Sequence, residues 1–150
     1  MKIIMKIVAL FSLALFSQLA TAACSLDVEV GDALTFSQTQ LAVEKGCGNV
    51  TINLKHTGKL AASVMGHNWV LTKDSDANDV AAKGLAAGLG NNYVPAGDAR
   101  VIAATKIIGG GETTSISFST DSLTAGGSYI YVCTFPGHSF VMRGTLTVGA

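Results

Sequence analysis

The segment from Cys133 to Met142, with the sequence CTFPGHSFVM, brings three metal-donor side chains into one short stretch. Cys133 offers a thiol, His138 offers an imidazole, and Met142 offers a thioether. Pro136 and Gly137 lie between the first two donors and favour a turn there. Such sulfur and nitrogen donors suit a first-row transition metal. Because chance rarely places three of them so close together, the segment predicts a metal-binding loop.

A complete coordination shell needs a further donor from elsewhere in the chain. With His138 used, His56 and His67 are the histidines that remain. His67 follows Gly66, whose missing Cβ lets its backbone carbonyl approach a ligand closely. In a strand, His67 would also share a face with Trp69, a large core residue. We therefore predict His67 as the ligand and interpret His56 as a partly buried structural histidine, with pH sensing as an open alternative.

Two imidazoles, one thiolate and one thioether make up the donor list of a blue-copper site. In such a site the two histidines and the cysteine form a trigonal plane, and the methionine sulfur lies at a longer axial distance. Sulfur donors favour Cu(I) and imidazoles suit Cu(II), so a geometry between the two preferences serves both oxidation states. The donor list therefore predicts one-electron exchange at copper, with zinc as a competing metal.

The cysteines Cys24, Cys47 and Cys133 allow three alternative single disulfides, and sequence spacing does not choose among them. The metal donors next to Cys133 favour a metal-bound thiolate at that position. A disulfide between Cys24 and Cys47 is then the economical pairing in an oxidising compartment. The alternative for Cys133 is an inert buried thiol.

Residues 1–22 have the pattern of a secretory signal peptide. Lys2 and Lys6 precede the apolar run 7–16, which is followed by the small residues of QLATAA. The run is too short for a membrane span, so we expect cleavage before Ala23 and a mature domain of residues 23–150. The alternative is a lipoprotein acylated at Cys24, although Thr21 stands where an apolar residue is usual.

The charge of the mature chain excludes several classes of function. Removing Lys2 and Lys6 from the 10 basic residues leaves 8 against 10 acidic ones, a net charge of −2. A near-neutral chain without a basic tract is a poor nucleic-acid binder. A second apolar run is absent from the sequence, so no membrane span is expected. The length suits one exported domain with a single core.

Alternation of apolar and polar residues predicts a series of short strands. It is clearest in residues 49–56, 113–120 and 144–148, and further candidates are SLDVEV, HNWVLT, RVIAATKII and SYIYVC. Seven or eight short strands predict an all-β sandwich of two sheets. One short helical insertion is predicted around residues 75–90, where an Ala-rich run ends at Gly88 or Gly90. The donor loop would then join two neighbouring strands at the rim of the sandwich.

The motifs MGHNWVL and CTFPGHSFVMRGTLTV, the early pair of cysteines and the helical insertion resemble the azurin family of bacterial periplasmic cupredoxins. The similarity covers essentially the whole mature chain. It implies a cupredoxin-like Greek-key β-sandwich that carries single electrons between respiratory redox proteins. It also implies the following roles: His67, Cys133 and His138 as equatorial copper ligands, Met142 as the axial ligand, Gly66 as a weak carbonyl contact, Asn68 as a hydrogen-bonding support, and Cys24 with Cys47 as the disulfide.

The family pattern further implies an apolar docking patch around the edge of His138, through which electrons would pass. Its members would be Met65, Leu85, Phe135, Pro136 and Phe140. The implied partners are c-type cytochromes, nitrite reductase or a peroxidase, met transiently by a monomer in the periplasm of a Gram-negative bacterium. Two positions depart from the family: Thr57 stands where many azurins carry proline, and Phe140 is bulkier than the usual small residue.

Catalytic alternatives lack the residues they need. A copper enzyme requires a second metal centre or an open ligand position, and only His56 remains once the predicted ligands are assigned. A nucleophile formed by Cys133 and His138 has no identified oxyanion donors or orienting acid. We therefore expect no enzyme. The main alternative function is a copper or zinc carrier of the same fold, although such carriers often show exposed Met and His clusters, which are not seen here.

Overall fold

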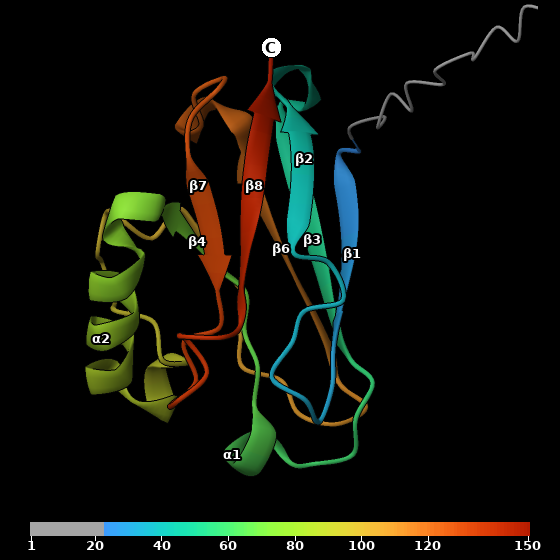
Figure 1. Ribbon diagram of the computed structural model, residues 1–150, viewed down its shortest axis with the longest axis vertical. Coiled ribbons are helices and arrows are strands. Elements are labelled where there is room, and N and C mark those ends of the chain that lie inside the picture. The colour runs from blue at the N-terminus through green and yellow to red at the C-terminus, as the bar shows by residue number, and fades with distance from the viewer. Residues whose placement is uncertain (1–22) are drawn as a thin grey trace, which may run out of the picture.

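The computed structural model describes residues 23–150, and the predicted signal peptide lies outside the described residues. Within them, strands form two sheets that pack face to face as a sandwich (Figure 1). One sheet has the order β1 (Ser25–Val30), β3 (Asn49–His56), β6 (Thr113–Ser119). The other has the order β2 (Gln40–Glu44), β8 (Arg143–Gly149), β7 (Tyr129–Val132), β4 (Val70–Lys73), β5 (Ala103–Ala104). The predicted all-β sandwich is confirmed.

The pairing of the strands is mixed. β1 runs parallel to β3, and β2 runs parallel to β8, whereas the other neighbours are antiparallel. Successive side chains of a strand point to opposite faces, so alternating sequences bury one face. β3 accordingly buries Val50, Ile52 and Leu54 between the sheets, and β8 buries Leu146 and Val148.

An aromatic stack fills the centre of the core. The Trp69 ring lies 5.3 Å from that of Tyr131 and 6.1 Å from that of Phe118. The Tyr131 hydroxyl donates a 2.6 Å hydrogen bond to the Gln38 carbonyl. Gly144 pairs with Tyr131 across β7 and β8, and a Cβ there would clash with the tyrosine ring. These contacts fix the register of β7, whose next residue is Cys133.

The helical insertion packs on the outer face of the five-stranded sheet at β4 and β7. After a 3-10 turn at Asp74–Asp76, α2 (Ala77–Ala87) packs Val80 against Val70 and Val132. It is capped at Gly88, whose positive φ of 74° favours glycine. The predicted insertion around residues 75–90 is therefore confirmed. No helix in residues 23–150 is both long and apolar enough to cross a bilayer.

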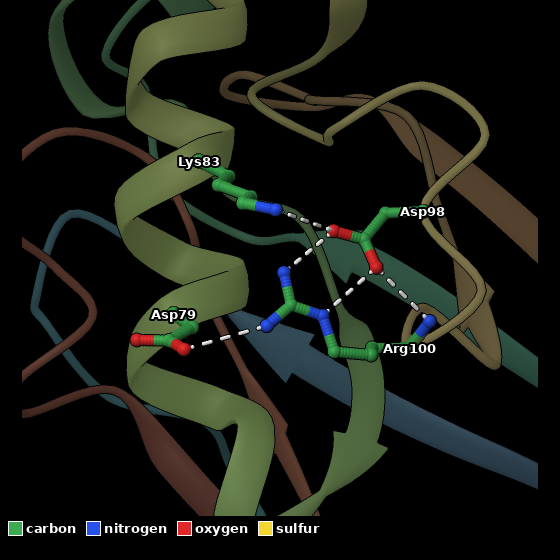
Figure 2. A network of polar contacts seen from close by, with 4 residues as sticks. All are labelled: Asp79, Lys83, Asp98 and Arg100. Carbon is green, nitrogen blue, oxygen red and sulfur yellow. Dashed lines mark hydrogen bonds and ion pairs between the residues drawn. The ribbon is translucent and has the colours of Figure 1, made fainter.

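An ionic network ties α2 to the loop that leads to β5 (Figure 2). Asp98 receives hydrogen bonds from the Arg100 Nε at 2.9 Å and the Arg100 Nη2 at 2.7 Å. From α2, Lys83 approaches Asp98 to 3.6 Å and Asp79 approaches Arg100 to 3.4 Å. The loop and the helix are therefore held together by four alternating charges.

Two strand predictions differ from the structure in extent, and one strand was not predicted. The strand β2 was not among the predicted strands. The predicted strand 100–108 shrinks to β5. Directly after β5, the Thr105 hydroxyl accepts the Trp69 N–H at 2.9 Å and interrupts the regular ladder on that side. β4 begins at Val70, so His67 precedes it and pairs with Ile108 as an isolated bridge. A last short helix, α1 (Ala62–Met65), comes directly before that bridge.

Candidate metal centre

The loop between β7 and β8 folds its donors back onto one another. The Cys133 N–H donates to the Met142 carbonyl at 3.1 Å, and the Met142 N–H donates to the His138 carbonyl at 2.9 Å. Between them, Gly137 has a φ of 80°, which favours glycine. The backbone thus closes the loop at the rim of the sandwich, where the sequence predicted it.

Three predicted ligands meet in one buried cluster. The Cys133 Sγ lies 3.7 Å from the His67 Nδ1 and 3.6 Å from the His138 Nδ1. The three donor atoms all lie within 4.8 Å of one another. Metal bonds of about 2.3 Å to sulfur and about 2.0 Å to nitrogen, at trigonal angles, would separate S and N by about 3.7 Å. The donor spacing therefore fits one first-row metal ion.

Gly31 sets the orientation of His67. The His67 Nε2 lies 2.8 Å from the Gly31 carbonyl, which can only accept a hydrogen bond. Nε2 therefore carries the proton, and Nδ1 presents its lone pair to the donor cluster. Burial lowers the pKa of His67 to about 4, so the imidazole is neutral at neutral pH, as a metal ligand must be. Sequence reasoning missed Gly31, because a backbone carbonyl leaves no mark on residue type.

The other two donors also lie in an apolar environment. Cys133 is fully buried, and burial raises the pKa of its thiol to about 11, while the backbone N–H groups of Asn68 and Phe135 partly oppose that rise. Burial lowers the pKa of His138. A metal that binds this cluster must therefore displace the thiol proton, and it meets neutral imidazoles.

Asn68 connects the two loops that carry the donors. Its Nδ2 donates to the Thr134 hydroxyl at 2.8 Å, and its Oδ1 accepts the Thr134 N–H at 2.8 Å. A third bond of 2.8 Å runs from the same Nδ2 to the Asn92 carbonyl. Because Asn68 follows His67 and Thr134 follows Cys133, the bonds fix the two ligand positions relative to each other. Thr134 and Asn92 were not predicted.

Gly66 precedes His67, and the Met142 carbonyl accepts the Cys133 N–H, so the backbone of both residues lies near the cluster, while their roles as ligands stay predictions. A Cβ on Gly66 would lie 2.3 Å from the Ala62 carbonyl and 2.7 Å from the Ile107 side chain. Close packing is thus one reason for glycine here, and the predicted carbonyl contact with the metal stays a prediction. Met142 is fully buried within the loop that carries His138.

His56 lies behind His67 and outside the donor cluster. The two rings stack at 5.1 Å. The His56 Nδ1 accepts the Gly58 N–H at 3.1 Å, so its Nε2 donates to the Met65 carbonyl, 3.0 Å away. The side chain is only 1% exposed, so the prediction of a partly buried residue was wrong. Both ring nitrogens form hydrogen bonds with the backbone of loops around the site, which agrees with the interpretation of His56 as a structural histidine.

A surface groove lies between α2 and the donor loop. Four of the five predicted docking residues line it: Leu85, Phe135, Pro136 and Phe140. Leu85 is 53% and Phe140 84% exposed, so the rim of the groove is apolar. Met65 lies on α1 and does not line the groove. His138 is 5% exposed, and the centroid of its ring lies 4.6 Å from that of Phe135, so the lining of the groove covers most of the imidazole.

The cysteine pairing is confirmed. Cys24 and Cys47 form a disulfide, and Cys133 is the free, buried cysteine of the described chain. The alternative of an acylated Cys24 conflicts with this pairing, because the sulfur is already bonded.

Comparisons with known proteins point to one family. Residues 22–149 match the family described as "Copper binding proteins, plastocyanin/azurin family". "Azurin-1" of Alcaligenes xylosoxydans xylosoxydans is 54% identical over 125 residues, which cover 83% of this chain and 97% of that protein. "Azurin" of Bordetella pertussis is 51% identical over 125 residues, 83% of each chain. A solved azurin structure from the methylotroph Methylomonas sp. strain J is 46% identical, with a TM-score of 0.83 over 86% of this chain and 100% of that one.

Proposed function

The chain belongs to the plastocyanin/azurin family of copper-binding proteins, and on that premise we propose that it carries single electrons between redox proteins by means of one type 1 copper ion. The equatorial ligands in this proposal are His67, Cys133 and His138. Met142 is the axial thioether, and the Gly66 carbonyl is a weak further contact. Copper bound there would supply a one-electron Cu(II)/Cu(I) couple.

The observation that carries the proposal is the buried cluster of one thiol and two imidazoles at metal-ligand spacing. His67 and Cys133 are fully buried, and so is Met142, which this proposal makes the axial ligand. The residues therefore keep solvent and small molecules away from the donors. A substrate would find no accessible position at the centre, which supports an electron carrier over an enzyme.

The surrounding hydrogen bonds support the same function. Gly31 holds the His67 ring, and Asn68 joins the loops of His67 and Cys133 through Thr134. A ligand frame held by protein contacts changes little between two oxidation states of a bound metal. Little rearrangement means a low barrier to electron exchange.

The groove beside His138 supports docking of a partner protein. Its rim offers the exposed apolar groups of Leu85 and Phe140, and Phe135 packs directly on the His138 ring. A small, mostly apolar contact suits transient redox encounters. We propose c-type cytochromes, nitrite reductase or a peroxidase as the partners. The Cys24–Cys47 disulfide and the predicted signal peptide favour the periplasm as the compartment.

The test is optical and magnetic. Cu(II) is added to the purified protein, visible and EPR spectra are recorded, and ascorbate and then an oxidant follow. We expect an intense blue thiolate-to-copper band with small hyperfine splitting, bleached by the reductant and restored by the oxidant. The Cys133→Ser variant is the control and should lack the blue band, because it lacks the thiolate.

Two results would count against the electron-carrier proposal. A colourless protein that binds zinc in preference to copper would indicate a metal carrier. A pale copper adduct that never cycles with reductant and oxidant would indicate the same.

A further inference from the structure

Two neighbouring residues adopt the left-handed backbone conformation, which residues other than glycine usually avoid. Asn92 and Tyr93 have φ values of 55° and 54°, and no other non-glycine residue in 23–150 has a positive φ. Asparagine tolerates the left-handed region fairly well, but tyrosine does so at a cost. Such strain persists where surrounding contacts enforce it, and it clusters at functional sites. The contacts of this pair therefore show what the strain maintains.

Asn92 forms hydrogen bonds with two segments next to His67: the residue that follows it in the chain and the segment that pairs with it. Its carbonyl accepts the Asn68 Nδ2 at 2.8 Å, and its side-chain Oδ1 accepts the Ile107 N–H at 3.0 Å. Asn68 is the next residue after His67. Ile107 precedes Ile108, which exchanges backbone hydrogen bonds of 3.0 and 2.9 Å with His67. One residue thus connects to both sides of a predicted ligand.

The same path continues to Cys133. Asn68 uses the Nδ2 that bonds Asn92 to bond the Thr134 hydroxyl as well, and its Oδ1 accepts the Thr134 N–H. Thr134 is the residue after Cys133. Asn92 therefore reaches the loops of two ligands through one intermediate side chain, without contacting a donor atom itself.

Tyr93 packs between α2 and the donor loop. Its ring meets the Phe135 ring edge to face at 5.5 Å. Its carbonyl lies against Gly84 of α2, where a Cβ would come within 2.1 Å of that oxygen. Tyr93 therefore has α2 on one side and Phe135 of the donor loop on the other.

A simple turn explains only part of this arrangement. Asn92 ends the 3-10 turn Leu89–Asn91, and a left-handed asparagine is common at such an end. Turn formation requires no partners beyond the local backbone. The bonds to Asn68 and Ile107, which are 24 and 15 residues away in sequence, are additional.

From these contacts we infer that Asn92 is a positioning residue for the metal centre, braced by Tyr93 against α2. The inference rests on the proposed copper function for its metal readout only. The helical insertion is thereby tied to the loops of His67 and Cys133. The Asn92 side-chain oxygen holds the Ile107 N–H in place, and the Asn92 backbone carbonyl fixes the side-chain amide of Asn68.

The first test uses the metal-free protein and amide hydrogen exchange. Asn92→Gly keeps the left-handed backbone but removes the acceptor of the Ile107 N–H. Loss of a hydrogen bond of about 1 kcal/mol should speed exchange at Ile107 roughly fivefold, whereas the Thr134 N–H, which bonds Asn68, should change less. The matched control is Asn91→Gly, because Asn91 bonds only the Ala87 carbonyl with its side chain. Asn92→Asp keeps an acceptor oxygen and should restore slow exchange at Ile107.

The second test uses the copper-loaded protein. Asn92→Gly should lower Cu(II) affinity roughly tenfold, as removal of groups that orient ligands commonly does. It should also change the hyperfine splitting and the blue band, whereas Asn91→Gly leaves both as in the wild type. If Asn92→Gly does not fold, Asn92→Ser replaces it, since its hydroxyl is too short to reach the Ile107 N–H.

The outcomes separate this inference from the proposed function. A wild-type protein without a blue band would overturn the copper function, and the exchange results would still decide whether Asn92 braces the loops. A blue wild type whose Asn92→Gly variant matches Asn91→Gly in exchange, affinity and spectra would overturn the role of Asn92.

Discussion

At the residue scale, His138 differs from the other donors in its access to solvent. His138 is 5% exposed, whereas His67 and Cys133 are fully buried. Replacing it by glycine should open a channel from the surface to the remaining donors. We therefore expect His138→Gly with added Cu(II) to lose the normal blue band and to regain a blue band when imidazole is added. Titration of the visible spectrum with imidazole measures this.

The control for that experiment is His56→Asn. His56 is equally aromatic and lies one ring behind His67, but its nitrogens bond Gly58 and Met65. The variant should show no response to imidazole. An unchanged spectrum in His138→Gly, with no imidazole binding, would mean that His138 is not a ligand.

The candidate site was predictable where its chemistry depends on residue type. Thiol, imidazole and thioether donors are visible in the sequence, and the structure brings His67, Cys133 and His138 together. The groups that hold them were not predictable. Gly31 acts through its carbonyl, and Asn92 acts through a left-handed backbone that no local pattern distinguishes from an ordinary turn.

At the scale of elements, the link between α2 and its neighbouring loop depends on charge (Figure 2). Hydrogen bonds from Arg100 hold the pKa of Asp98 well below its ordinary value. In the unfolded chain this carboxyl has a pKa of about 4. A carboxyl whose pKa is lower in the folded state stabilises the fold fully at pH values above that unfolded-state pKa, and this contribution is lost as the pH falls below it. Asp98→Asn should therefore lower the thermal midpoint at pH 7, with a difference from wild type that shrinks between about pH 4 and pH 2.

Thermal unfolding of both proteins from pH 7 to pH 2, in the same metal state, measures this. Asp121→Asn is the matched control, since Asp121 is exposed and forms none of the ion pairs found in residues 23–150. A difference between wild type and Asp98→Asn that stays constant down to pH 2 would contradict the role of the Asp98 charge.

The elements themselves were predictable to different degrees. α2 was clear because an Ala-rich run between acidic residues and glycine has few alternatives. β3, β6 and β8 were clear because each alternates on a half-buried surface. β2 was missed because the apolar Ala42, on its less buried face, hides the alternation of Leu41 and Val43. The C-terminal extent of β5 was overestimated because the side-chain hydroxyl of Thr105 replaces a backbone acceptor, which is a tertiary effect.

At the scale of the whole molecule, the docking groove should control partner encounter without altering the metal centre. Burying the exposed ring of Phe140 against a partner is worth about 1.5 to 3 kcal/mol. Phe140→Ser should therefore slow electron transfer to a c-type cytochrome by about tenfold or more in stopped-flow experiments and leave the blue band unchanged. Val64→Ser is the control, because Val64 is similarly exposed on α1 but lies outside the groove. Equal rates in the two variants would place docking elsewhere.

The disulfide and the metal centre lie at opposite ends of the molecule. The disulfide lies where β1 begins, at the end of the sandwich opposite α1 and the loops around the donors (Figure 1). It joins residues 23 apart in sequence, and closing such a loop should stabilise the fold by about 3 kcal/mol.

Replacing both cysteines by serine should therefore lower the free energy of urea unfolding by about 3 kcal/mol, because the unfolded chain gains freedom. The visible and EPR spectra of the copper form should stay as in the wild type, since Asn68, Gly31 and Thr134 hold the ligands independently of the disulfide. The comparison requires urea titrations of the metal-free proteins and spectra of the loaded ones. A changed hyperfine splitting in the double variant would show instead that the two ends are coupled, so that stability and electron transfer could not vary separately in this fold.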